Sequence, residues 1–195
     1  GYEGYRFVGN SLYDGLTRYD LKQGDSVPKI VPGLAESWTP NADGSVWTFV
    51  LRQGVNFSDG TPFNADAVVF NLDRYLNPSA PQYYAAAAGT AAISLGGVKS
   101  YTKVDDSTVE IATNGPLSHL PSDLVFVYMG SPTAIQKYGN TEYANHPAGT
   151  GPFLMESLTR GQQMVLTPNK DYWGGAPKLD KLILKPIPDT STRLA

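Results

Sequence analysis

The side chains that usually perform catalysis or bind metal ions are few in this sequence. There is no cysteine, and the two histidines, His119 and His146, lie far apart and form no ligand-spaced pair. Asp105 and Asp106 are neighbours in a predicted turn, where adjacent carboxylates diverge, so we interpret them as turn formers. Because no converging set of catalytic groups is visible, the sequence predicts no enzyme activity, no metal site and no cofactor.

Two glycine-containing segments match known motifs only in part. In residues 9–13, Tyr13 occupies the position where a nucleophile elbow needs its second glycine. Residues 149–154 begin like a dinucleotide-binding loop, but Leu154 replaces the third glycine and Pro152 lacks an N–H group that a phosphate would need. We therefore expect neither a serine nucleophile nor a nucleotide site in these segments.

Tyrosine is the residue type that most suggests ligand binding. The chain has 12 tyrosines and 7 phenylalanines. A loop tyrosine presents an apolar face and a hydroxyl at little entropic cost, which suits contact with a polar organic ligand. The competing interpretation of each one is half-buried packing. The tyrosines in predicted loops and short segments are Tyr2, Tyr5, Tyr83, Tyr84 and Tyr128.

Composition narrows the classes of partner. The 195 residues include 15 basic and 18 acidic side chains, giving a net charge of -3, and no run of like charge occurs. This balance argues against binding to nucleic acid or to an anionic membrane surface. No apolar stretch approaches the roughly 20 residues that a membrane-spanning helix needs. We expect no nucleic-acid partner and a chain that does not itself span a membrane.

Two helices are indicated by their start and stop signals. Asn64 can cap a helix whose apolar residues recur at helical spacing from residue 65 to residue 76, before Asn77 and Pro78 stop it. A shorter helix is predicted from Ser131, as its cap, to Gly139, as its C-terminal stop. Residues 81–97 contain many small side chains and give no clear boundaries.

Three hairpins and a final strand are predicted from short apolar runs. Residues 34–38 pair with 46–51, 98–104 with 108–112, and 153–158 with 163–166, each across a turn-forming segment. The strand at 46–51 is largely apolar on both faces, which favours cover on both sides. Residues 179–187 form the last predicted strand. The predicted fold is therefore mixed α and β, of the α+β type, with a mixed sheet, flanking helices and a hairpin-rich subdomain.

The order of several motifs closely resembles the oligopeptide, dipeptide and nickel-binding family of extracellular solute-binding proteins, family 5. These proteins serve ABC importers. Each segment alone is weak evidence, but the set occurs in the family's order from about Leu12 to the end of the chain. The segments are residues 12–16, 32–38, 47–55, 57–63, 149–153, 169–175 and 187–193.

The resemblance implies a two-lobed protein in which a ligand binds between the lobes. By position, residues 1–34 and 150–195 would belong to the main N-terminal lobe, and residues 35–149 would form a smaller hairpin-rich subdomain of it. The crossing to the second lobe would fall near residues 186–192. Because the chain begins with Gly1 rather than Met, and its last residues, 189–195, carry the signals of a helix start, we interpret it as a fragment that lacks the second lobe.

The resemblance also implies a non-enzymatic function. The protein would capture a peptide-like solute and deliver it to the permease subunits of an ABC transporter. It would lie in the periplasm or be anchored outside the cytoplasmic membrane. Nickel complexes or oligosaccharides are the alternatives within the family. The alternatives outside it are a hydrolase, for which no catalytic set is visible, and a protein-interaction module that uses the same tyrosines.

Three segments correspond to places where the family contacts its ligands. They are the loop after the family's first strand, an aromatic stretch beyond the first long helix, and the segment before the Ser131 helix. By position the expected ligand-binding residues are Tyr2, Glu3, Gly4, Tyr83, Tyr84, Tyr128 and Met129.

Overall fold

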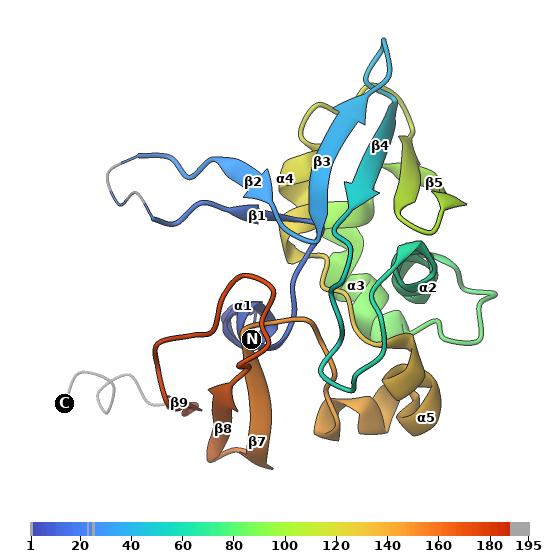
Figure 1. The fold of residues 1–195 in the computed structure, drawn as a ribbon. Helices are drawn as coiled ribbons and strands as arrows, with labels where there is room; N and C mark the ends of the chain where they lie inside the picture. The colour runs from blue at the N-terminus through green and yellow to red at the C-terminus, as the bar shows by residue number, and fades with distance from the viewer. Residues whose placement is uncertain (1, 23, 25, 188–195) are drawn as a thin grey trace.

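The computed structural model describes residues 2–22, 24 and 26–187, and within them it contains five α-helices and three antiparallel sheets (Figure 1). The predicted α+β class is confirmed, but the predicted mixed sheet is not found among the described residues, because all their strand pairs are antiparallel. The helices are α1 (Tyr2–Leu12), α2 (Ala65–Leu76), α3 (Ala85–Leu95), α4 (Leu120–Asp123) and α5 (Pro132–Glu142), with the 3-10 turns η1 (Leu124–Phe126) and η2 (Tyr143–Asn145). The strands are β1 (Thr17–Tyr19), β2 (Ile30–Pro32), β3 (Ala35–Pro40), β4 (Val46–Leu51), β5 (Val98–Asp105), β6 (Thr108–Thr113), β7 (Phe153–Thr159), β8 (Gln163–Pro168) and β9 (Leu182–Leu184).

The main core lies on one face of a four-stranded sheet of order β3-β4-β6-β5. Helix α2 packs against β5 and β6, and α3 packs between α2 and α4 (Figure 1). Alternation along β4 sends Trp47, Phe49 and Leu51 into this core. The prediction that β4 is covered on both sides is wrong, because Val50 on the other face is 40% exposed.

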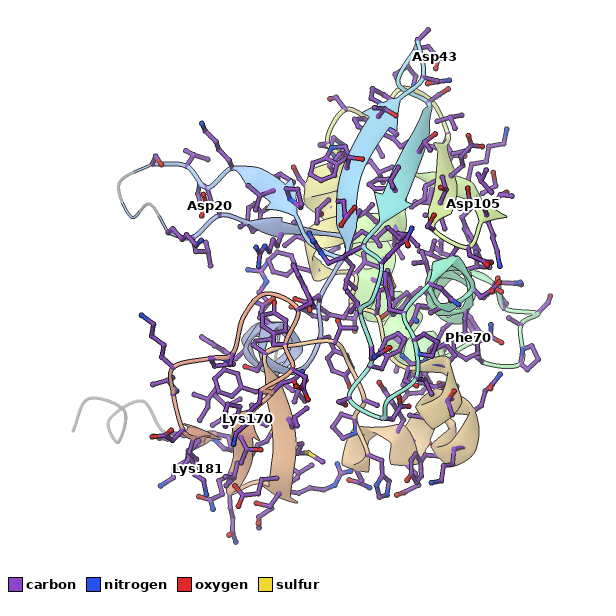
Figure 2. All side chains as sticks on the ribbon, in the orientation of Figure 1. Asp20, Asp43, Phe70, Asp105, Lys170 and Lys181 are labelled. Carbon is purple, nitrogen blue, oxygen red and sulfur yellow. The ribbon has the colours of Figure 1, made fainter. Side chains whose placement is uncertain are left out.

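All three predicted hairpins are present. Strand β3 pairs with β4, β5 with β6, and β7 with β8, each antiparallel. Aspartates hold two of the turns: the carboxylate of Asp43 accepts from the Ser45 N–H, and that of Asp105 accepts from the Ser107 N–H. Figure 2 shows both aspartates at the hairpin tips. The role of Asp105 as a turn former is therefore confirmed.

Helix α2 begins and ends as its sequence predicts. The Asn64 side chain accepts a hydrogen bond from the Ala67 N–H at 3.0 Å, which satisfies one of the free donors of the first turn. Leu72 is fully buried against the sheet. Asn77 takes an extended conformation and ends the helix. This rigid helix carries the charged residue of the site described below.

We expect the Asn64→Ala substitution to lower the free energy of unfolding by about 1 kcal/mol, because it removes the capping acceptor of α2. Asn64→Asp, which keeps an acceptor at the same place, should lose much less. Urea unfolding of the full-length protein at neutral pH measures both values. Equal losses in the two variants would mean that the cap does not stabilise α2.

One predicted helix end is confirmed, and one predicted strand is too long. Ser131 caps α5 as expected, and the first helical segment stops at Gly139, which has the non-helical φ of 70° that glycine adopts easily. A further helical turn follows this kink and extends α5 to Glu142. The last strand is shorter than predicted, since only Leu182–Leu184 pair with β8.

Other predictions on organisation remain open. The uncertain segment 81–97 contains α3. The predicted helix start at the C-terminus and most of the predicted hinge segment, from residue 188 onward, lie outside the described residues. The division into residues 1–34 with 150–195 and residues 35–149 stays a prediction. No helix in the described part of the chain is long and apolar enough to cross a membrane.

Candidate functional site

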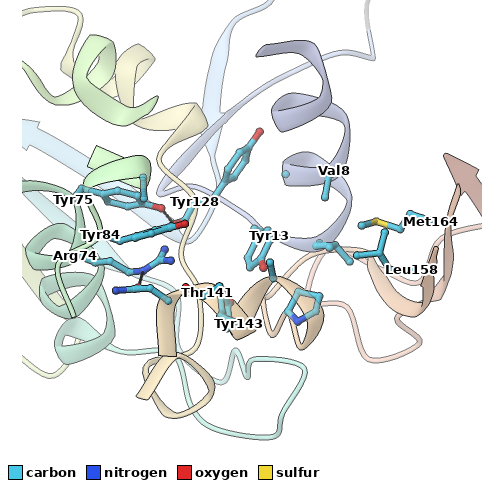
Figure 3. A pocket seen from close by; sticks show the side chains of 17 residues that line it. Val8, Tyr13, Arg74, Tyr75, Tyr84, Tyr128, Thr141, Tyr143, Leu158 and Met164 are labelled. Atoms are coloured by element: carbon cyan, nitrogen blue, oxygen red, sulfur yellow. Dashed lines mark hydrogen bonds between the residues drawn. The ribbon is translucent and has the colours of Figure 1, made fainter. Parts of the chain in front are cut away.

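A cavity of about 380 Å³ lies where α1, the end of α2, the start of α3 and the α5–η2 segment meet the β7-β8 hairpin (Figure 3). Its volume is within the range of small-molecule sites. Its lining is mostly apolar and aromatic. Five tyrosines contribute to it: Tyr13, Tyr75, Tyr84, Tyr128 and Tyr143.

Helix α1 approaches the cavity closely because of a glycine. A Cβ atom at Gly9 would lie 2.1 Å from the ring of Tyr128, so only glycine allows this contact. The Tyr128 hydroxyl donates a hydrogen bond to Asn10 Oδ1 at 2.8 Å, also on α1. The helix and the Tyr128 segment therefore form one wall of the cavity.

The tyrosine hydroxyls and rings make a connected wall. The ring of Tyr13 lies 6.2 Å from that of Tyr128 and 6.4 Å from that of Tyr143. The Tyr143 hydroxyl donates to the Ala148 carbonyl at 2.8 Å. Burial raises the pKa of Tyr143 to about 12 and raises the pKa of Tyr13 as well, so both hydroxyls stay protonated at neutral pH.

Arg74 brings a charge to this apolar wall. It lies in the last turn of α2 and is 8% exposed. Its Nε donates to Asn140 Oδ1 at 2.9 Å, and the Asn140 amide in turn donates to the carbonyls of Gln82 and Tyr83. The guanidinium carbon lies 5.4 Å from the ring centroid of Tyr84, a cation–π distance. The side chain is therefore held in one orientation.

Among the residues that the structure describes, no acidic side chain pairs with Arg74 at the cavity. Among the described lining residues Arg74 is the one that carries a charge, and no ion pair joins it to a described carboxylate. The neighbouring Asp73 is engaged elsewhere, since its carboxylate accepts from the Tyr101 hydroxyl at 2.7 Å and from the Gln82 amide at 3.4 Å. The cavity thus presents a positive charge within an aromatic surround.

A buried carboxylate fixes the segment that follows α1. Asp14 accepts hydrogen bonds from Trp173 Nε1 at 2.9 Å, from the Thr150 hydroxyl at 3.0 Å and from the Tyr172 hydroxyl at 3.1 Å. Burial raises the pKa of Asp14, while these donors oppose the shift. Three motif segments that are distant in sequence meet at this carboxylate, next to Tyr13 of the cavity wall.

The structure brings two of the expected ligand-binding residues to the cavity, Tyr84 and Tyr128. Tyr83 does not line it, and its carbonyl instead accepts from the Asn140 amide. Met129 is fully buried in the main core, and its N–H donates to the Asp14 carbonyl. Met129 therefore has a packing role in this structure.

The expected loop at Tyr2, Glu3 and Gly4 is wrong, because these residues form the first turn of helix α1. A helix there is favoured by apolar residues such as Val8 and Leu12, which recur at helical spacing toward the cavity. The side chains of residues 2–5 are not described, so a ligand role for them stays a prediction.

Sequence reasoning missed Arg74, Tyr75 and Asn140. One signal for Arg74 was present: Asn71 and Arg74 fall on the buried side of α2, among apolar residues at helical spacing. Polar residues at such positions need a partner or a function. Asn71 bonds to the backbone of Gly130, and Arg74 faces the cavity.

The sequence matches the profile of the bacterial extracellular solute-binding proteins, family 5 Middle, over residues 29–195. Among curated relatives, the glutathione-binding protein GsiB of Shigella flexneri serotype 5b is 37% identical over 195 residues, which cover 96% of this chain and 35% of that protein. Heme-binding protein A of Haemophilus influenzae is 35% identical, with 98% and 37% covered. The chain thus spans about a third of the length of these relatives.

Solved structures agree with these matches. The periplasmic binding protein DppA of Helicobacter pylori, in complex with the peptide STSA, superposes with a TM-score of 0.83 at 30% identity, covering 98% of this chain and 40% of that one. A dipeptide-binding protein of a Pseudoalteromonas species, in complex with Met-Leu, gives a TM-score of 0.81 at 25% identity, covering 100% and 41%. The similarity extends over nearly the whole chain.

Proposed function

Because the chain belongs to the bacterial extracellular solute-binding proteins of family 5, we propose that it serves an ABC importer by binding a peptide-like solute in the cavity beside Arg74. The observation that carries this proposal is the cavity itself, an aromatic enclosure with one fixed cation. Tyrosine rings contact apolar side chains and peptide groups alike, and the guanidinium suits a carboxylate. The function is binding and delivery, without catalysis.

The relatives support a peptide over the other solutes of the family. Glutathione, the peptide STSA and the dipeptide Met-Leu are named with three of them. A complex of nickel with histidine and a heme-binding function are named with others. The cavity favours the peptide because its described lining residues offer aromatic faces and hydroxyls but neither histidine nor a carboxylate.

In this proposal the solute is enclosed between two lobes. The described cavity would supply one side, and a second lobe would close over the ligand. Ligand binding would shift the population from open to closed forms, and the permease subunits in the membrane would recognise the closed form. This places the protein in the periplasm or anchored outside the cytoplasmic membrane.

A thermal-unfolding screen of the full-length protein tests the proposal. We expect short peptides such as Met-Leu to raise the unfolding temperature, since a ligand at 100 times its Kd stabilises the folded state by about 2.7 kcal/mol. A nickel–histidine complex and a linear oligosaccharide are the comparison ligands. Stabilisation by one of these alone, or turnover of any peptide, would contradict the proposed function.

A further inference from the structure

We propose that Arg74 binds a carboxylate of the solute, so that the site selects ligands with a free carboxylate next to an apolar group. This inference rests on the proposed function, because it names the chemical class of solute that the cavity takes. It is carried by the juxtaposition of the fixed guanidinium, its tyrosine neighbours and the apolar far end of the cavity.

The guanidinium of Arg74 is a buried positive charge. A buried cation is unfavourable unless an anion or hydrogen-bond acceptors replace its water. Arg74 is 8% exposed, and in the described part of the chain its guanidinium interacts with Asn140 Oδ1 and with the Tyr75 hydroxyl but with no carboxylate. An anion that enters the cavity could pair with this guanidinium directly, because no described Asp or Glu has to be displaced from it first.

Hydrogen bonding and ring contacts fix the orientation of the Arg74 guanidinium. The Nε bond to Asn140 uses the side of the guanidinium that faces α5, and the two Nη atoms have no carbonyl or carboxylate acceptor among the described residues. A planar guanidinium can donate two parallel hydrogen bonds to one carboxylate. The rings of Tyr84 and Tyr143 lie 5.4 and 5.6 Å from its carbon, which limits its movement. Arg74 is therefore preorganised as a carboxylate receptor.

The two ends of the cavity differ in the side chains that line them. In Figure 3, Arg74, Tyr75 and Tyr84 lie at one end of the cavity, and Leu158 and Met164 lie at the other. Leu158 and Met164 are directly opposite each other in the β7-β8 register, so they form one apolar surface. A ligand with a carboxylate at one end and an apolar group at the other matches this division.

The competing explanation is that Arg74 only positions its neighbours. Its carbonyl accepts from the Tyr84 N–H, and its side chain fixes Asn140. If Arg74 has a purely structural role, replacing it would weaken the binding of all ligands by the same factor. Loss of a carboxylate contact would weaken only ligands that carry the carboxylate, and this difference decides between the explanations.

The experiment compares two matched ligand pairs by calorimetry on the full-length protein. Met-Leu is paired with Met-Leu amide, and hexanoate with hexanamide, so that each pair differs in the carboxylate. The variants are Arg74→Gln and Arg74→Lys. Arg160→Gln is the control, because Arg160 is exposed and neither it nor Asn145, to which its side chain donates, lines the cavity.

In the wild-type protein and the control we expect the acid of each pair to bind about 10- to 100-fold more tightly than its amide, the range for a hydrogen-bonded charge. In Arg74→Gln the ratio should fall to about 1 while amide affinity is retained. Arg74→Lys should give an intermediate ratio, since it keeps the charge but loses the planar pair of donors. Retained amide binding also shows that the variants are folded.

Equal loss of acid and amide binding in Arg74→Gln would overturn the inference, as would an unchanged ratio. The hexanoate pair separates the inference from the proposed function. If Met-Leu does not bind but hexanoate is preferred over hexanamide only when Arg74 is present, the peptide function fails and the carboxylate site stands. If Met-Leu binds without any preference over its amide, the function stands and the carboxylate site fails.

Discussion

The Phe49→Ala substitution is expected to lower the free energy of unfolding by about 3–5 kcal/mol, because it removes a large aromatic side chain from a close-packed core. Phe49 is fully buried in β4. It lies opposite Trp38 on β3 and Val109 on β6, with its ring 6.4 Å from that of Trp38. Both neighbouring strands restrict how far the core can collapse, so much of the vacated volume should remain as a cavity.

Val50 provides the matched control on the same strand. It is the next residue of β4 but points to the other face, where it is 40% exposed. Val50→Ala should change stability by about 0.5 kcal/mol or less, as surface substitutions usually do. Urea unfolding of the full-length variants measures the difference. Similar losses at the two positions would contradict the one-sided core of this sheet.

The elements that could be predicted from the sequence are those whose signals are local. Helix α2 has its cap, its apolar spacing and its stop within residues 64–78, and each hairpin has its turn between two apolar runs. Whether another layer packs on the outer face of β4 could not be predicted in this way. Its outer residues are apolar enough for a buried strand, yet whether a layer packs there depends on the rest of the fold.

Helix α1 shows why the first segment was misread. It contains Gly4 and Gly9, and glycine lowers helix propensity by about 1 kcal/mol each relative to alanine. Tertiary contacts override this preference, because Gly9 is what allows the helix to pack on Tyr128. The contact joins positions more than a hundred residues apart, so no local pattern indicates it.

The candidate site was predictable only in its residue types. Loop tyrosines predicted an aromatic site, and Tyr84 and Tyr128 do line the cavity, while ligand binding by them stays a prediction. Arginine near the end of an amphipathic helix usually faces water, and the burial of Arg74 depends on Asn140, which lies 66 positions further along the chain. The neighbouring Tyr83 and Tyr84 differ because α3 starts directly after them and turns only one toward Arg74.

The second large effect is expected at Asp14. Asp14→Ala should lower the free energy of unfolding by about 2–4 kcal/mol, since it leaves three donors on two distant segments without their acceptor. These donors are the Trp173 indole and the hydroxyls of Tyr172 and Thr150. Asp14→Asn should lose less, because its amide oxygen still accepts on one side while its NH2 group faces a donor on the other.

The pH dependence of the same variants tests whether Asp14 is ionised in its buried site. Burial raises its folded pKa above the unfolded value of about 3.9, so the folded state retains a proton that the unfolded chain releases. The contribution of Asp14 to stability is therefore largest below pH 4, falls as the pH rises through the folded pKa, and is constant above it. Asp14→Asn has no such proton.

Unfolding measured from pH 4 to pH 8 should then show the advantage of wild type over Asp14→Asn becoming smaller with rising pH and levelling off near neutrality. An advantage that grows with pH would mean that the three donors outweigh burial and hold the folded pKa of Asp14 below its ordinary value. Because Asp14 directly follows the cavity-lining Tyr13 in the chain, the same variants should also weaken ligand binding, whereas Val50→Ala should not.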